Sequence, residues 1–253
     1  MNRQKENFVD TRELVENSSN LAAILEEQGI RIDENAADSL LRYYEMIVEK
    51  NKVMNLTRIT EFEDAVRKHF ADSLAIENAS GLDLNQNLSV LDLGTGAGFP
   101  GIPLALAFPK LKVTMIDTVG KKIQFVNEVI NALNIENAVA LHARAEEMAF
   151  DKKHREQYDL CVSRAVANLS TLSEYCLPFI KTGGYFIAYK AGDSGQEIDA
   201  AANAIKILGG SDVETIKYSL YDMERVFVKI KKGKHTPRNY PRKAGTPAKN
   251  PIS

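Results

Sequence analysis

Cysteine is scarce in this sequence of 253 residues, which holds only Cys161 and Cys176, and these two do not form a Cys-x-x-Cys pair. A disulfide framework or a structural zinc site needs more cysteines at closer spacing, so we predict neither, and no metal site. Long apolar runs are missing as well, because no segment approaches the ~20 residues of a membrane span. The first ten residues lack the apolar stretch of a secretory signal. We therefore expect a soluble cytoplasmic protein without membrane contact.

Acidic residues are missing from one end of the chain. Residues 229–253 hold eight Lys and Arg residues and no Asp or Glu, whereas residues 1–228 hold 24 basic and 34 acidic residues. The net charge of −2 thus combines a tail of +8 with a body of −10. Such a tail suggests a local contact with a polyanion. A tail that only keeps the protein soluble would carry the same charge, so charge alone leaves both interpretations open.

The hydrophobic residues, 44% of the chain, are arranged in two patterns. Up to about residue 81 they recur at helical spacing, whereas from residue 87 short apolar runs alternate with helical stretches. The expected strands are residues 88–93, 112–116, 138–142, 158–163 and 185–189, with helices at 101–108, 121–133 and 169–179. This alternation predicts a parallel sheet with helices on both faces.

Two more strands, at 213–220 and 225–230, are expected after a helix at 197–208. Because they follow each other closely, they should form an antiparallel hairpin at a sheet edge. The predicted fold is α/β and Rossmann-like, with a mostly parallel seven-stranded sheet. We divide the chain into an N-terminal helical extension packed on the core (residues 1–85), the core (86–232) and a basic C-terminal tail (233–253).

A glycine-rich loop, VLDLGTGAGFPG at residues 90–101, follows the first expected strand. Its glycines let the backbone approach a ligand closely, and the next helix begins with free N–H groups. Residues 96–101 match the dinucleotide pattern G-x-G-x-x-G, which indicates NAD(P). The glycines, however, begin directly after the strand, with Asp92 two residues ahead, which favours S-adenosylmethionine. Asp117, at the end of the second strand, suits the ribose of either cofactor.

Longer motifs make the comparison specific. They are residues 67–74 (RKHFADSL), 90–109 (VLDLGTGAGFPGIPLALAFP), 117–125 (DTVGKKIQF), 142–147 (HARAEE), 158–169 (YDLCVSRAVANL) and 240–251 (YPRKAGTPAKNP). From about residue 40 onward the chain closely resembles the bacterial small-subunit ribosomal RNA guanine-N7 methyltransferases, the family also known as glucose-inhibited division protein B. This resemblance implies a class I methyltransferase fold, S-adenosylmethionine as the cofactor, and 16S rRNA, within the small subunit or an assembly intermediate, as the partner.

The resemblance also implies a set of cofactor-binding residues. Carried over position by position, they are Gly94 and Phe99 in the glycine loop, Ala145 and Glu146 after the third strand, and Arg164 after the fourth. We add Gly96 from the glycine pattern and Asp117 from its spacing. Ala145 and Glu146 are expected to read the adenine edge, and Arg164 to bind a carboxylate.

The implied reaction needs no catalytic acid or base, and we assign none. Guanine N7 carries a lone pair and no proton, so positioning alone can promote its methylation. Exocyclic-amine methyltransferases of this fold carry a D/N-P-P-Y/F motif where residues 163–166 read Ser-Arg-Ala-Val. His69 could face the site, but a structural histidine is the simpler interpretation.

Four basic residues are candidates for RNA contact: Lys190, Arg238, Arg242 and Lys243. Those in the tail could neutralise phosphates, and Tyr240 could stack on a base. The prolines and glycine of the tail also fit an ordered loop laid against the body. Two other functions stay open from the residues alone, an NAD(P)-dependent oxidoreductase and a non-catalytic RNA-binding assembly factor.

Overall fold

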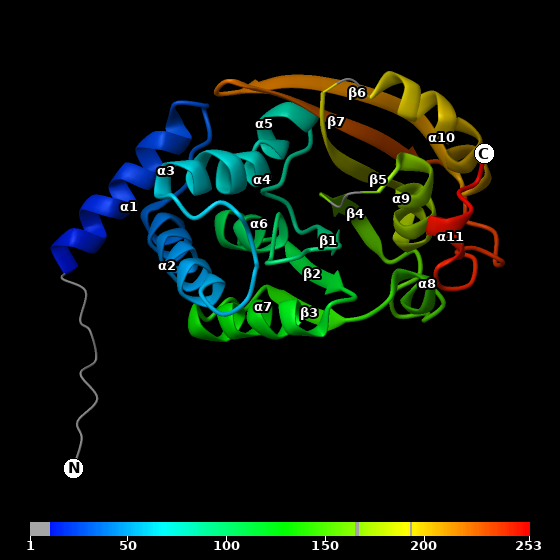
Figure 1. Ribbon diagram of the computed structural model, residues 1–253. Helices are drawn as coiled ribbons and strands as arrows, with labels where there is room; N and C mark the ends of the chain where they lie inside the picture. Colours follow the sequence, from blue (N-terminus) through cyan, green and yellow to red (C-terminus); the bar gives the residue numbers. More distant parts are fainter. Residues whose placement is uncertain (1–10, 165–166, 193) are drawn as a thin grey trace, which may run out of the picture.

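A single seven-stranded sheet forms the centre of the computed structural model, which describes residues 11–164, 167–192 and 194–253 (Figure 1). Its strands lie in the order β3-β2-β1-β4-β5-β7-β6. They are β1 (Ser89–Leu93), β2 (Lys112–Asp117), β3 (Ala138–His142), β4 (Tyr158–Ser163), β5 (Ile180–Ala191), β6 (Gly210–Leu220) and β7 (Met223–Lys232). Strands β1 to β5 run parallel, and β7 pairs antiparallel with both β5 and β6. The predicted sheet and its antiparallel edge hairpin are confirmed.

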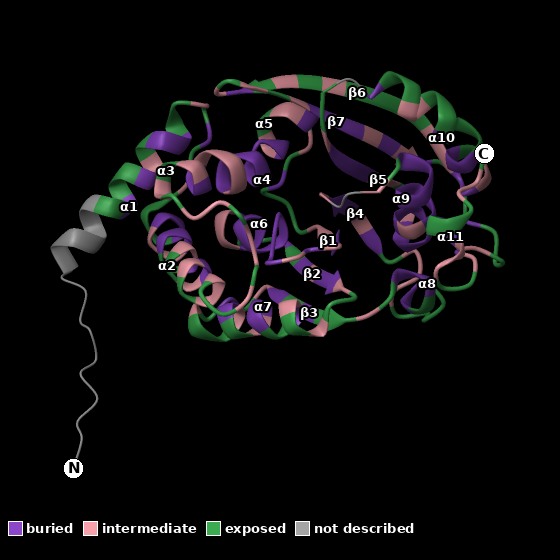
Figure 2. Ribbon diagram, viewed as in Figure 1, coloured by how far each residue is buried: buried purple, intermediate pink, exposed green. Residues whose placement is uncertain are grey.

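Alternate residues of each central strand enter two hydrophobic clusters, one on each face of the sheet. Val90 packs with α6 (Gly101–Ala107) and α7 (Gly120–Ala132), whereas Leu91 belongs to the cluster of the other face. That second cluster includes residues of α8 (Ala145–Met148), α9 (Leu169–Cys176), the 3₁₀ turn η2 (Leu177–Phe179) and α10 (Gly195–Ile207). The central strands are accordingly buried on both sides (Figure 2). Both faces are covered, as parallel strands require.

The N-terminal helices share one core with the sheet. They are α1 (Thr11–Glu26), α2 (Glu34–Asn51), α3 (Phe62–Ala65), the π-helical turn η1 (Val66–Ala71), α4 (Asp72–Leu74) and α5 (Ile76–Ser80). Leu40 and Phe70 are buried in the same cluster as Val90 of β1. The connection between α2 and α3 and the turn η1 thereby lie beside the carboxyl ends of the strands. Among the described residues, no helix is long and apolar enough to cross a membrane.

The C-terminal tail folds back onto the body and ends in the short helix α11 (Thr246–Lys249) beside α9 (Figure 1). The Arg155 guanidinium donates hydrogen bonds to the carbonyls of Thr236, Pro237 and Tyr240. Thr171 Oγ1 donates to the carbonyl of Pro247 at 3.0 Å. These bonds satisfy backbone carbonyls that would otherwise need water, so the tail is an ordered part of the fold.

Candidate cofactor and substrate site

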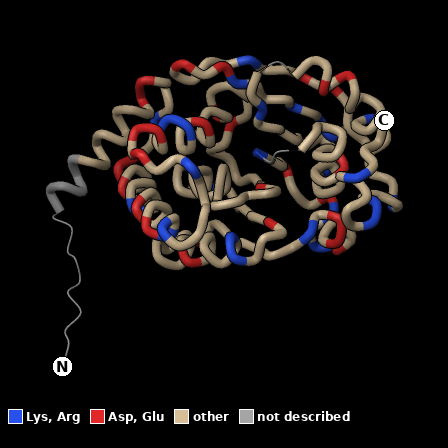
Figure 3. The backbone as a smooth tube through the Cα atoms, in the orientation of Figure 1, with Lys and Arg blue, Asp and Glu red and all other residues tan. Residues whose placement is uncertain are grey.

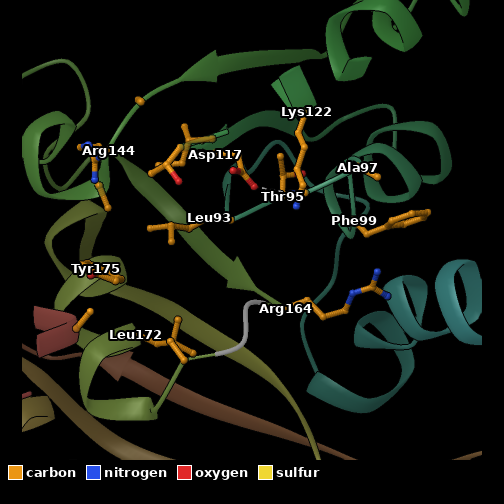
Figure 4. A pocket seen from close by; sticks show the side chains of 18 of the residues that line it. Leu93, Thr95, Ala97, Phe99, Asp117, Lys122, Arg144, Arg164, Leu172 and Tyr175 are labelled. Atoms are coloured by element: carbon orange, nitrogen blue, oxygen red, sulfur yellow. Dashed lines mark hydrogen bonds between the residues drawn. The ribbon is translucent and has the colours of Figure 1, made fainter. Parts of the chain in front are cut away.

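A cavity of about 620 Å³ opens at the carboxyl ends of β1, β2 and β4. All seven predicted cofactor-binding residues line it: Gly94, Gly96, Phe99, Asp117, Ala145, Glu146 and Arg164. Ligands of doubly wound sheets bind at this edge, where the strand order reverses between β1 and β4. Figure 4 shows Arg144 and Tyr175 at one end of the cavity, Asp117 and Thr95 in the middle, and Phe99 with Arg164 at the other end.

The buried Asp92 fixes the conformation of the glycine loop through two hydrogen bonds. Its Oδ2 accepts hydrogen bonds from Thr95 Oγ1 at 2.6 Å and from the Gly101 amide at 2.8 Å, so one carboxylate ties the strand end to the start of α6. Burial raises the pKa of Asp92 to about 7, although these two hydrogen bonds oppose the shift. A Cβ on Gly101 would lie 2.5 Å from Met115 Cγ, which explains why glycine is needed there.

The loop itself turns through left-handed backbone. Gly94, Gly96 and Gly98 have φ of +77°, +62° and +114°, conformations that glycine adopts without strain. A Cβ on Gly98 would lie 2.7 Å from the Tyr43 hydroxyl of α2, which donates to the Ala97 carbonyl at 2.8 Å. The helical extension therefore packs directly on the loop.

Asp117 joins two loops at the middle of the cavity. Its Oδ2 accepts from the Gly96 amide at 2.9 Å and its Oδ1 from the Val119 amide at 2.8 Å. A carboxylate oxygen can accept two hydrogen bonds, so each oxygen keeps a free lone pair. Asp117 can thus bind a ribose hydroxyl while it also fixes the glycine loop.

Glu146 has a partner that the sequence did not predict. Its Oε1 accepts from the Gly245 amide of the tail at 2.9 Å, and the side chain is buried. Gly245 and Ala248 themselves line the cavity. The tail thus forms part of the cavity wall, next to the position expected for adenine. Nothing in the spacing of these residues could show this, because 99 positions separate Glu146 from Gly245.

The opposite end of the cavity is built around Phe99. The His69 ring stacks on Phe99 with centroids 4.5 Å apart, and the Arg164 guanidinium lies 4.9 Å from the Phe99 centroid. Arg164 Nη1 donates to Asp72 Oδ2 at 3.1 Å, and Arg225 Nε donates to Asp72 Oδ1 at 3.0 Å. The buried Asp72 carboxylate therefore positions Arg164 from behind.

His69 lines the cavity and is also hydrogen-bonded, so it faces the site as well as holding the structure together. Burial and the neighbouring Arg164 lower the pKa of His69 to about 3. The imidazole is neutral at physiological pH. Leu56 and Thr57, which precede it in the chain, also line the cavity. The family-like run MNLT at residues 54–57 includes both, but it gave them no role in the site.

The four candidate RNA-binding residues occupy different environments. Lys190 Nζ donates to Glu197 Oε1 at 2.7 Å and to the Ala167 carbonyl at 2.9 Å, and only 13% of its side chain is exposed. Arg242 forms a bidentate ion pair with Glu174, whose side chain is fully buried. Arg238 and Lys243 are exposed. The charges of Lys190 and Arg242 are thus balanced inside the protein.

Basic residues are spread over the whole molecule, and some of them lie on the tail and around α8 (Figure 3). Arg144 lines the cavity from the start of α8, and Lys243 lies two residues from the cavity-lining Gly245. The second half of the Ser-Arg-Ala-Val segment, residues 165–166, lies outside the described residues.

A doubly wound sheet with a glycine loop after β1 and an acidic residue at the end of β2 defines a Rossmann-like protein that binds a nucleotide or nucleoside. The model of the family described as rRNA small subunit methyltransferase G matches residues 36–224. The chain belongs to this family.

Curated relatives extend the match over most of the chain. The ribosomal RNA small subunit methyltransferase G of Lachnoclostridium phytofermentans is 46% identical over 230 residues, which are 90% of this chain and 94% of that protein. The protein of the same name from Alkaliphilus metalliredigens is 47% identical over 229 residues, 90% of this chain and 95% of that protein. Among solved structures, a predicted O-methyltransferase from Agrobacterium tumefaciens is similar with a TM-score of 0.49 and 18% identity, covering 60% of this chain and 77% of that one.

Proposed function

We propose that this protein transfers a methyl group from S-adenosylmethionine to N7 of one guanine in a loop of 16S rRNA, in the cytoplasm. The observation that supports this most strongly is the convergence of all seven cofactor candidates on one cavity, in a chain of the methyltransferase G family. The same cavity extends from Arg144 and Tyr175 to Phe99 and Arg164 (Figure 4).

The residues of the cavity fit the parts of this cofactor. A Cβ on Gly96 would meet no protein atom within 4 Å, so the backbone there leaves space for a ligand. Asp117 keeps two free lone pairs for ribose hydroxyls, and Ala145 with Glu146 lies where the adenine edge would be read. Arg164 uses Nη1 and Nη2 in its described hydrogen bonds, which leaves Nε–H free for a carboxylate.

The residues need only bind, orient and desolvate for this reaction. When bound, S-adenosylmethionine supplies a methyl group activated by its sulfonium. Guanine N7 attacks with its lone pair, so a C–N bond forms as the C–S bond breaks, and no proton leaves the base in that step. The low pKa of His69 is consistent with this scheme, because no side chain has to accept a proton. Good orientation alone is worth up to ~7–11 kcal/mol of barrier.

We further propose that the substrate is the small ribosomal subunit or an assembly intermediate. Residues 1–228 carry a net charge of −10, and two of the four candidate RNA-binding side chains are already paired with acids. Of the four candidates, only Arg238 and Lys243 are exposed. A structured particle offers additional contacts that would compensate for this small basic surface, and guanine N7 is accessible in a loop rather than in an A-form helix.

Mass mapping of rRNA from a strain that lacks the gene tests the function in the cell. We expect 16S rRNA from that strain to lack one N7-methylguanine, which returns when the gene is supplied again. An unchanged modification pattern would refute the proposal. Calorimetry of the purified protein with S-adenosylmethionine and with NAD separates the two cofactors, and binding of NAD alone would favour the oxidoreductase.

A further inference from the structure

Thr57 lines the cavity, and its neighbours hold its backbone and its hydroxyl in place. Asn51 Oδ1, at the end of α2, accepts from the amides of both Leu56 and Thr57, at 2.8 and 3.1 Å. The Ile59 amide donates to Thr57 Oγ1 at 3.1 Å, and His69 Nε2 lies 2.8 Å from the same oxygen. These contacts fix both the backbone and the side chain of Thr57 before any substrate arrives.

The direction of the hydrogen bond between His69 and Thr57 follows from Arg164. Arg164 Nη2 lies 3.3 Å from His69 Nδ1, and a guanidinium can only donate. The Nδ1 atom of the neutral imidazole is therefore the acceptor, and the single ring proton sits on Nε2. His69 Nε2–H then donates to Thr57 Oγ1.

Thr57 Oγ1 consequently accepts two hydrogen bonds, one from His69 and one from the Ile59 amide. These use both lone pairs of the oxygen, so the hydroxyl proton has to point elsewhere. Within the described part of the chain, no acceptor receives it. Because Thr57 lines the cavity, its hydroxyl can donate a hydrogen bond to a ligand at the Phe99 end but cannot accept one.

We propose that the Thr57 hydroxyl donates a hydrogen bond to O6 of the target guanine and thereby selects guanine over adenine. This inference rests on the proposed function. The Hoogsteen edge of guanine offers N7 and O6, both acceptors, whereas adenine carries the N6 amino donor next to its N7. A hydrogen bond from Thr57 to O6 of guanine orients the adjacent N7 toward the cofactor. In adenine the same hydroxyl would meet the N6 amino group, which is a donor, so no such hydrogen bond forms.

A chain of hydrogen bonds runs from Asp72 through Arg164 and His69 to Thr57. Asp72 holds Arg164, Arg164 sets the His69 tautomer, and His69 occupies a lone pair of Thr57. A hydroxyl without such partners could rotate and accept from the adenine amino group as readily as it donates to O6. The fixed chain of donors removes that freedom, so Thr57 is a specificity-determining residue.

The test compares guanine with 2-aminopurine, which keeps N7 but lacks O6. Small subunits are reconstituted around 16S rRNA that carries one or the other base at the methylated position. The specificity constant kcat/KM is measured for the wild type, Thr57→Val, Thr57→Ser, and the control Thr60→Val from the same connection, which does not line the cavity. Calorimetry with S-adenosylmethionine checks that each variant binds the cofactor.

We expect the wild type and Thr57→Ser to prefer guanine by roughly 10- to 100-fold, as one good base contact provides. Thr57→Val should bring the ratio close to one, and Thr60→Val should keep it. A wild type that methylates both particles equally would overturn the inference, whatever the variants do. So would a Thr57→Val enzyme with the wild-type ratio. If the wild type fails on the guanine particle itself, the proposed function is wrong.

Discussion

Asp117 combines two roles at the residue scale. It accepts hydrogen bonds from two backbone amides, those of Gly96 and Val119, and it faces the middle of the cavity. Asp117 therefore links the conformation of the glycine loop to the position of the ribose. A change in the loop would move the carboxylate that is expected to bind the ribose. The acid at the end of β2 could be predicted from its spacing, whereas its contact with Gly96 could not.

Replacement of Asp117 by Ala should weaken S-adenosylmethionine binding by ~1–3 kcal/mol, because the ribose hydroxyls lose a charged acceptor and the loop loses its anchor. Calorimetry measures the affinity. Asp83→Ala serves as the control, since Asp83 is a carboxylate outside the cavity. Unchanged affinity in a folded Asp117→Ala protein would remove Asp117 from the site.

His69 should make the protein sensitive to acid. The native state keeps the ring neutral down to a pH of about 3, whereas the unfolded chain protonates it near 6.5. Between these values the unfolded state binds more protons, so stability falls as the pH falls. The wild type should lose up to about 2 kcal/mol more than His69→Gln between pH 7.5 and 5. Urea unfolding at both pH values gives the comparison, and equal losses would show that His69 is accessible to protons.

At the scale of the elements, the existence of the strands and helices could be predicted from their apolar patterns, whereas some of their end points could not. The expected strands at 88–93 and 158–163 match β1 and β4 because buried parallel strands read as short apolar runs. Strand β5 begins at Ile180, five residues before the expected start, because it runs through Gly183 and Gly184, which the sequence marks as a turn. The helix expected at 169–179 ends at Cys176 and continues as a 3₁₀ turn that contains Pro178.

The site residues divide in the same way. Motifs led to seven cofactor candidates that share one cavity, because these residues follow strands of the sheet. Thr57 and the tail residue Gly245 could not be placed, since their positions depend on how the N-terminal helices and the tail dock. Gly245 is 99 positions from its partner Glu146, and such a separation leaves no periodic signal in the sequence.

An ion pair attaches the tail to α9, in addition to the hydrogen bonds that Ser170 and Thr171 donate to tail carbonyls. Arg242 pairs with Glu174, whose carboxylate is fully buried, so Arg242→Ala leaves a buried charge without its partner. We expect a decrease of ~3–5 kcal/mol in the free energy of unfolding, or detachment of the tail. Lys243→Ala is the matched control, since Lys243 is exposed and its effect should be small. Chemical denaturation measures both, and equal stabilities would contradict this role of Arg242.

At the scale of the whole molecule, the tail serves both the fold and the proposed RNA contact. Its buried partners hold it on α8 and α9, while Arg238 and Lys243 stay exposed. The RNA contact suggested by the charge and the ordered loop suggested by the prolines and glycine are therefore compatible. Removal of the whole tail cannot separate them, because it also takes away part of the cavity wall.

Reversal of the two exposed charges isolates the RNA contact. Arg238→Glu with Lys243→Glu should leave the fold and cofactor binding intact, because both side chains are exposed. Binding to the small subunit should weaken, and the slope of log affinity against log salt should flatten by ~0.7–0.9 for each phosphate that the variant no longer neutralises. Filter binding at several salt concentrations gives the slope. A double variant with the wild-type slope would show that these two residues do not touch phosphates.

Methyl transfer by the purified protein tests the central claim most directly. The protein is incubated with labelled S-adenosylmethionine and small subunits from a strain without the gene, and in parallel with naked 16S rRNA. Mass spectrometry of nuclease fragments then locates the label. We predict one methyl group on N7 of a single guanine in a 16S rRNA loop, with the particle as the better substrate. Absence of label in both substrates, or label on any other atom, would contradict the account.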